Sequence, residues 1–143
     1  MIVESSAGQR LFPPVVTIHG LDDARKVLGY GLPVTLLSGP GAAGVGGILW
    51  WRAVMLQARA EHPKVAVFDV LDCGSAPGLA MGALRCGQEV LVLDAAVPAF
   101  ARVAAAAREM GSVLLPARPA SLDLAVRGAL PRLEAHLSGH APS

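Results

Sequence analysis

Five short runs of apolar residues recur along the chain, separated by segments in which apolar residues follow a helical spacing. The runs occupy residues 15–18, 34–37, 65–70, 90–93 and 113–115. None of them alternates cleanly between apolar and polar residues, as a strand with one solvated face does. Unbroken runs of this kind are typical of a parallel sheet that is covered on both faces. The pattern therefore predicts five parallel strands.

The segments between these runs predict helices. The expected helices span residues 21–28, 43–60, 75–86, 97–110 and 121–137. We expect a kink or break near Ala129 in the last one, because Pro131 removes a backbone donor and crowds the preceding turn. Strands that alternate with helices predict a single-domain, doubly wound α/β fold with a mainly parallel five-stranded sheet and helices on both faces. This three-layer arrangement resembles the Rossmann and flavodoxin folds.

Length and composition limit the domain organisation. A chain of 143 residues is long enough for one hydrophobic core, so we assign residues 15–138 to one domain, residues 1–14 to an N-terminal arm and residues 139–143 to a C-terminal tail. Hydrophobic residues make up 53% of the chain and charged residues only 16%. This balance favours an oligomer, because the apolar surface needs more cover than in an average domain.

Charge and hydropathy exclude several partners. The formal net charge is +1 and the chain has no run of Lys or Arg, so we expect no nucleic-acid partner. The most apolar stretch, residues 42–56, is interrupted by Arg52 and is too short to cross a bilayer, so we expect no membrane partner. No signal peptide is evident, and Cys73 and Cys86 lie too far apart along one predicted helix to pair. We therefore expect a soluble, cytoplasmic protein.

The ligand site is expected where the strands end. In open α/β sheets ligands bind beyond the carboxyl ends of the strands. The residues that the sequence places there, and that we take as ligand-binding candidates, are Ser38, Gly39, Gly41, Gly44, Asp69, Asp72, Gly74, Ser75 and Asp94. Arg118 follows the last predicted strand. These side chains and backbone amides favour a small anionic ligand.

The glycine-rich loop after the second strand is the sharpest local motif. Gly39, Gly41 and Gly44 have the spacing G-x-G-x-x-G between a strand and a helix. This motif resembles the dinucleotide-binding fingerprint, which implies backbone amides that face a pyrophosphate and, in Asp69, a carboxylate that holds a ribose hydroxyl. The cofactor that it implies is a nucleotide or another phosphate-containing ligand. The alternative interpretation is that small residues let this helix pack closely on a neighbour.

Three residues are candidates for catalysis. Cys73 precedes a predicted helix start, where the helix dipole lowers a thiol pKa and favours a thiolate nucleophile, and His19 is a candidate base for it. Ser38 is a second candidate nucleophile. The interpretation that we favour for Cys73 is a buried, unreactive thiol. His136 and His140 lack Cys or acidic companions at metal-ligand spacing, so we expect no metal site.

The helix expected over residues 43–60 has two apolar faces. One face carries Val45, Leu49, Ala53, Leu56 and Ala60, and the other carries Ile48, Trp51, Met55 and Ala58. A helix that flanks a sheet needs only one apolar face, so the second face is expected to meet another helix or another copy of the chain. We predict a homodimer whose interface includes Ile48, Trp50, Trp51 and Met55. The alternative is that Trp51 fills the core of its own chain.

Three functional hypotheses follow. The first is a homodimeric binder of a small anionic or nucleotide-like ligand at the carboxyl edge of the sheet. The second is a non-catalytic interaction or regulatory module that uses the Trp/Met helix face. The third is a transferase or hydrolase that depends on Cys73 or Ser38.

Overall fold

A computed structural model describes residues 3–4 and 10–139 of the chain. A six-stranded sheet forms its centre, with all pairs of neighbouring strands parallel. Its strands are β3 (Val15–Ile18), β4 (Val34–Ser38), β5 (Val67–Asp72), β6 (Val90–Val92), β7 (Val113–Leu115) and β8 (Leu122–Asp123). The helices are α1 (Leu21–Leu28), α2 (Ala42–Val45), α3 (Ile48–Glu61), α4 (Pro77–Arg85), α5 (Phe100–Glu109) and α6 (Leu133–Leu137), with a 3-10 turn, η1 (Leu130–Arg132), before the last.

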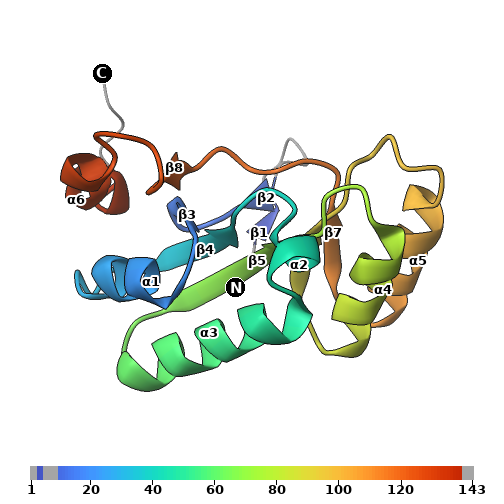
Figure 1. The fold of residues 1–143 in the computed structure, drawn as a ribbon, viewed down its shortest axis with the longest axis horizontal. Coiled ribbons are helices and arrows are strands. Elements are labelled where there is room, and N and C mark those ends of the chain that lie inside the picture. Colours follow the sequence, from blue (N-terminus) through green and yellow to red (C-terminus); the bar gives the residue numbers. More distant parts are fainter. Residues whose placement is uncertain (1–2, 5–9, 140–143) are drawn as a thin grey trace.

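The predicted α/β class is confirmed, with six parallel strands where the sequence predicts five. Two strands, β3 and β7, have the predicted bounds, and the other three predicted strands are shifted by at most two residues. The strand order is β7-β6-β5-β4-β3-β8, so β3 to β7 lie side by side in the order of the sequence (Figure 1). The sixth strand, β8, adds to the outer edge of β3.

The helices pack on one face of the sheet, whereas the sequence predicts helices on both faces. Right-handed crossovers between successive neighbours place their helices on the same side. Accordingly, α1 to α5 all contribute buried residues to a single cluster, which also holds Ile18, Leu36, Leu71 and Leu91 from the strands. This face supplies the main core, and α6 adds Leu133 and Leu137 to the same cluster.

The second face of the sheet is apolar as well, and extended chain lies over it. Its cluster consists of Val15, Leu37, Val70, Val90, Val92 and Leu115, with Phe12 and Val113 packed against it. Residues 116–121, which we call the strap, connect β7 to β8 and run along the upper side of the sheet in Figure 1, whereas α3 lies along its lower side. Arg118 and Ser121 of the strap both reach the Thr17 hydroxyl, whose side chain is on this face. The strap therefore belongs to a third layer.

The helix predicted over residues 121–137 is wrong for most of its length. Leu122 pairs with Val16 and Asp123 with Thr17, so this segment continues the sheet as β8. Pairing with the open edge of β3 gives hydrogen-bond partners to the backbone N–H and C=O groups of this segment. It also buries Leu122. The predicted break near Ala129 lies where the 3-10 turn η1 begins, and only residues 133–137 are α-helical.

The helix predicted over residues 43–60 is divided in two. Gly46 and Gly47 separate α2 from α3, and Gly47 has a φ of 91°, a left-handed conformation that favours glycine. Trp50 packs tightly on this break, because a Cβ on Gly46 would lie 2.6 Å from its ring. The glycine pair therefore turns the chain so that α3 can lie along the sheet.

The N-terminal arm contains a second, small sheet. Its two strands, β1 (Val3–Glu4) and β2 (Arg10–Leu11), pair antiparallel. The other residues of the predicted arm, 1–2 and 5–9, and residues 140–143 of the predicted tail lie outside the described residues. Over the described part of the chain, none of the helices combines the length and the apolar character that a membrane crossing requires.

Candidate ligand site at the carboxyl edge of the sheet

The carboxyl ends of β3, β4, β5 and β6 lie next to one another, because these strands are parallel neighbours. We call this edge the rim. The residues at or just beyond these ends are His19, Ser38, Asp72 and Asp94, each from a different strand. Hydrogen bonds link neighbouring ends: the Asp72 amide donates to Ser38 Oγ at 2.9 Å, and the Asp94 amide donates to the Gly74 carbonyl at 2.9 Å.

Arg118 of the strap joins three of these strand ends. Its Nη1 donates to Asp72 Oδ2 at 2.7 Å and to the Ser38 carbonyl at 2.9 Å, and its Nη2 donates to Thr17 Oγ1 at 3.0 Å. The Asp72 side chain is only 4% exposed, so its charge is compensated by Arg118 rather than by water. A charge-assisted hydrogen bond of this kind is among the stronger polar interactions in proteins.

A pocket of about 370 Å³ opens between the strap and the loop after β5. We call it the rim pocket, and its polar lining consists of Asp72, Gly74, Ser75, Asp94 and Arg118. Gly74 has a φ of 59°, and a Cβ on it would meet the Gly41 backbone at 3.5 Å, so the loops after β4 and β5 touch here. The pocket lies beside the start of α4, where no side chain caps the helix.

The glycine-rich loop leads into a very short helix and makes hydrogen bonds within its own backbone. Its helix, α2, has only four residues, and the loop uses its own amides. The Ala42 amide donates to the Gly39 carbonyl at 3.0 Å and the Gly44 amide to the Gly41 carbonyl at 2.9 Å. Steric crowding explains the glycine at position 39, because a Cβ there would lie 3.0 Å from the His19 ring.

Asp69 does not lie at the rim. The strand β5 continues to Asp72, which places Asp69 within the strand and turns its carboxylate under α3. It accepts hydrogen bonds from Trp51 Nε1 at 2.9 Å, from Gln88 Nε2 at 2.8 Å and from Arg59 Nη2 at 2.8 Å. The ribose-binding role that the fingerprint implies for Asp69 therefore has no support in its position.

Ser38 and Cys73 are buried and do not present nucleophiles. Ser38 is fully buried, and its Oγ donates to the Gly39 carbonyl at 3.3 Å while accepting from the Asp72 amide. Burial raises the pKa of the Cys73 thiol to about 12, and the charge of Asp72 adds to this effect. A thiol in this environment stays protonated at neutral pH, as expected for an unreactive cysteine.

His19 is the accessible side chain among the catalytic candidates, and Asp123 orients it. His19 Nε2 lies 2.7 Å from Asp123 Oδ1, and the His19 side chain remains 39% exposed. Burial raises the pKa of Asp123, but hydrogen bonds from His19 and the Ala125 amide outweigh it and hold the pKa below its ordinary value. Sequence reasoning missed Asp123, because it placed this residue in a helix.

The four predicted interface residues differ in burial, and two of them lie in the core. Trp51 is fully buried and Met55 is 3% exposed, so both belong to the core of their own chain. Ile48 and Trp50 are half-buried. The apolar residues of this region that remain exposed are on the other face: Val45 at 91%, Leu49 at 73% and Leu56 at 75%.

The histidines near the C-terminal end have no metal-site geometry. His136 Nε2 lies 2.8 Å from the Val15 carbonyl, which ties α6 to β3, and His140 lies outside the described residues. Across residues 3–4 and 10–139, no group of three or more His, Cys, Asp or Glu side chains could hold a metal ion.

Comparison of the chain with protein-family models gives no match, and comparison with curated proteins gives none either.

The burial of Cys73 predicts a reactivity order for the two thiols. With iodoacetamide at neutral pH, Cys73 should react much more slowly than the half-buried Cys86, because its thiol is both inaccessible and protonated. Mass spectrometry of the digested protein measures both rates, and unfolding in urea should make them equal. Alkylation of Cys73 ahead of Cys86 in the folded protein would restore it as a candidate nucleophile.

Proposed function

We propose that the protein binds a small anionic, nucleotide-like ligand in the rim pocket. The observation that carries this proposal is the position of the pocket. It lies at the rim, beside the uncapped start of the nine-residue helix α4 and beneath the strap that Arg118 holds in place. The amides of Gly78 and Leu79 in the first turn and the helix dipole favour a negatively charged group such as a phosphate, whereas Pro77, the first helical residue, has no N–H to donate.

The polar residues of the rim pocket suit the two parts of a nucleotide. The Ser75 side chain is exposed at the α4 start, where a phosphate would bind. Asp94 is exposed on the other side of the pocket, and a carboxylate there can accept hydrogen bonds from ribose hydroxyls. Asp72 adds little repulsion towards a phosphate, because its charge is paired with Arg118. The unpaired thiols, Cys73 and Cys86, fit a reducing, cytoplasmic compartment.

Nucleotide binding predicts a gain in thermal stability. AMP should raise the melting temperature of the protein, since a ligand that binds only the folded state adds about 2.7 kcal/mol at a concentration a hundred times its Kd. Ser75→Glu should remove most of this gain, because the added carboxylate repels the phosphate at the α4 start. Differential scanning fluorimetry measures both effects.

Ala135→Glu serves as the matched control for that experiment. It adds the same charge at an exposed site on α6, away from both the rim and the apolar face of α3, so it should leave the response to AMP unchanged. Inorganic phosphate tests the phosphate alone, without the ribose and base. If neither AMP nor phosphate stabilises the wild-type protein, or if Ser75→Glu responds as the wild type does, the rim pocket is not the site.

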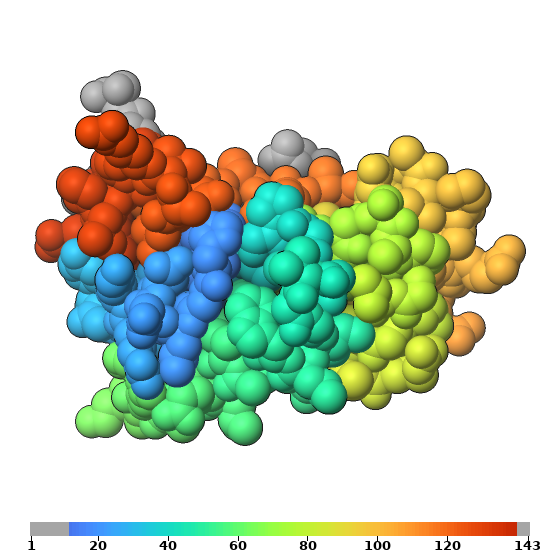
Figure 2. Space-filling view, in the orientation of Figure 1, coloured from blue at the N-terminus to red at the C-terminus, as the bar shows by residue number. Residues whose placement is uncertain are grey.

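We also propose that the protein forms a homodimer through the exposed apolar face of α3. Leu49 and Leu56 lie two turns apart on this face, with the small residues Ala53 and Ala60 between and beyond them. Val45, at the end of α2 just before the glycine break, is exposed as well. In Figure 2 no other element lies in front of α3, which runs along the lower part of the molecule in teal and green. Contiguous apolar surface of this kind marks protein interaction sites, and a self-complementary helix face suits a two-fold axis.

The proposed dimer predicts that charged substitutions on this face lower the molecular mass of the protein in solution. Sedimentation equilibrium at micromolar concentration should give a dimer for the wild type and a monomer for Leu49→Glu with Leu56→Glu, because four charges would then face one another across the axis. Met110→Glu places a charge on a half-exposed apolar residue at the end of α5 and should leave the dimer intact. A monomeric wild type would contradict the proposal.

A further inference from the structure

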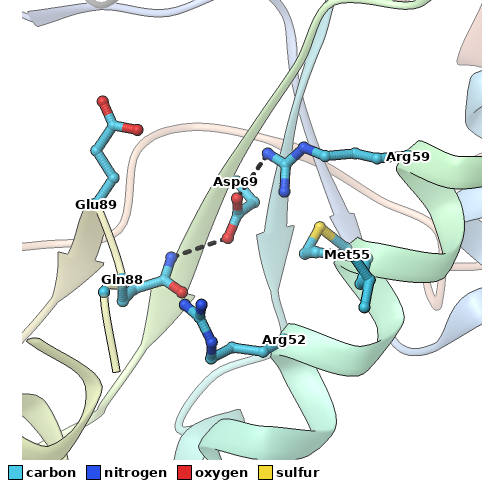
Figure 3. A pocket seen from close by; sticks show the side chains of 8 residues that line it. Arg52, Met55, Arg59, Asp69, Gln88 and Glu89 are labelled. Atoms are coloured by element: carbon cyan, nitrogen blue, oxygen red, sulfur yellow. Dashed lines mark hydrogen bonds and ion pairs between the residues drawn. The ribbon is translucent and has the colours of Figure 1, made fainter. Parts of the chain in front are cut away.

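A second pocket lies at the opposite end of the sheet from the rim. It has a volume of about 300 Å³ and opens between α3 and the turn that leads from α4 into β6. We call it the amino-end pocket, and the side chains that matter for its chemistry are those of Arg52, Met55, Leu56, Arg59, Asp69, Gln88 and Glu89 (Figure 3). It shares only Asp69 with the ligand-binding candidates of the sequence analysis.

Gln88 presents an unpaired carbonyl oxygen to this pocket. The residue is only 2% exposed, and its Nε2 donates to Asp69 Oδ2 at 2.8 Å and to the Val90 carbonyl at 3.0 Å. Both partners are acceptors, so they fix which end of the amide is the nitrogen. Oε1 therefore faces the other way, and it accepts no hydrogen bond from any residue that the structure describes.

The space around this oxygen has to be accessible. Every fully enclosed side-chain nitrogen or oxygen in the described part of the chain has a hydrogen-bond partner, so Gln88 Oε1, which has none, is not fully enclosed. The amino-end pocket is the open space that Gln88 lines. An acceptor on a nearly buried side chain is unfavourable while unpaired and gains from a ligand that donates to it.

Arg52 supplies a cation beside this acceptor. Its guanidinium nitrogens lie 3.8 Å from the position that a Cβ on Gly87 would take, next to Gln88 in the chain. Arg59 on the same helix face is paired with Asp69, whereas Arg52 makes no ion pair with any described residue. A free guanidinium in this position can bind a carboxylate through two parallel hydrogen bonds.

The charges of the pocket favour a zwitterion over a phosphate. Arg59 also lines the pocket and pairs with Asp69 at 2.8 Å, so Arg52 and Glu89 remain as the charges without an ion pair among the described residues. One cation and one carboxylate match the two charges of a zwitterion, whereas Glu89 would repel a doubly charged phosphate. Met55 and Leu56 provide an apolar wall. The pocket thus combines a site for a carboxylate at Arg52, an acceptor for an ammonium at Gln88, and apolar surface.

We propose that the amino-end pocket binds a free α-amino acid with an apolar side chain. Its carboxylate pairs with Arg52, its ammonium donates to Gln88 Oε1, and its side chain packs against Met55 and Leu56. The two charged groups of an α-amino acid are close together, as are Arg52 and Gln88 at the edge of this pocket (Figure 3). This site is independent of the proposed function at the rim.

The probe for this proposal is L-leucine, with two analogues that each lack one charged group. In ¹⁵N NMR spectra of the whole protein, L-leucine should shift the side-chain amide signals of Gln88. The analogue 4-methylpentanoate lacks the ammonium and isoamylamine lacks the carboxylate, so each should bind at least about tenfold more weakly, as expected for the loss of one charge-assisted hydrogen-bonded contact.

Arg52→Gln tests the carboxylate contact on the protein side. It should weaken L-leucine binding about tenfold or more, whereas Arg102→Gln, at an exposed position on α5, should not change it. Sedimentation of both variants shows whether the oligomeric state is the same. The proposal is overturned if L-leucine does not shift Gln88 at millimolar concentration, if both analogues bind as tightly as L-leucine, or if AMP shifts Gln88 and L-leucine does not.

Discussion

The ion pair between Arg118 and Asp72 connects the last part of the chain to the strand ends that form the rim. Asp72 ends the central strand β5, and Arg118 lies on the strap, which crosses the second face of the sheet. The same guanidinium also reaches the ends of β3 and β4. The strap leads directly into β8. This ion pair therefore holds the strap over the second face of the sheet and helps to place β8 as the sixth strand.

The consecutive order of the parallel strands separates two sets of chemical groups. At the carboxyl ends, it places the rim pocket between the strap and the start of α4. At the other end, the same strand order leaves the amino-end pocket between α3 and β6. There Asp69 accepts hydrogen bonds from three side chains. Helix α3 takes part in three environments at once, because Trp51 fills the core, Arg52 lines the amino-end pocket, and Leu49 faces solvent.

The apolar runs predicted the class of fold because continuous Val, Leu and Ile segments determine which strands can be buried. The sequence could also place His19 and Asp94 after strands, since these positions follow directly from the runs. Asp123 and the role of Arg118 could not be predicted, because they depend on β8 pairing with β3, a contact between residues more than a hundred positions apart. Asp69 was misplaced because it was assigned to the strand end although it lies inside the apolar run 65–70, and β5 continues two residues beyond that run.

A double-mutant cycle on Arg118 and Asp72 tests the central interaction most directly. Removal of one partner leaves the other charge, or its hydrogen bonds, uncompensated, so Arg118→Met alone should lower the free energy of unfolding by about 3 kcal/mol. Arg118→Met combined with Asp72→Asn should cost clearly less than the sum of the two single variants in urea unfolding, because both remove the same contact. Strictly additive losses would contradict the role that we assign to this pair.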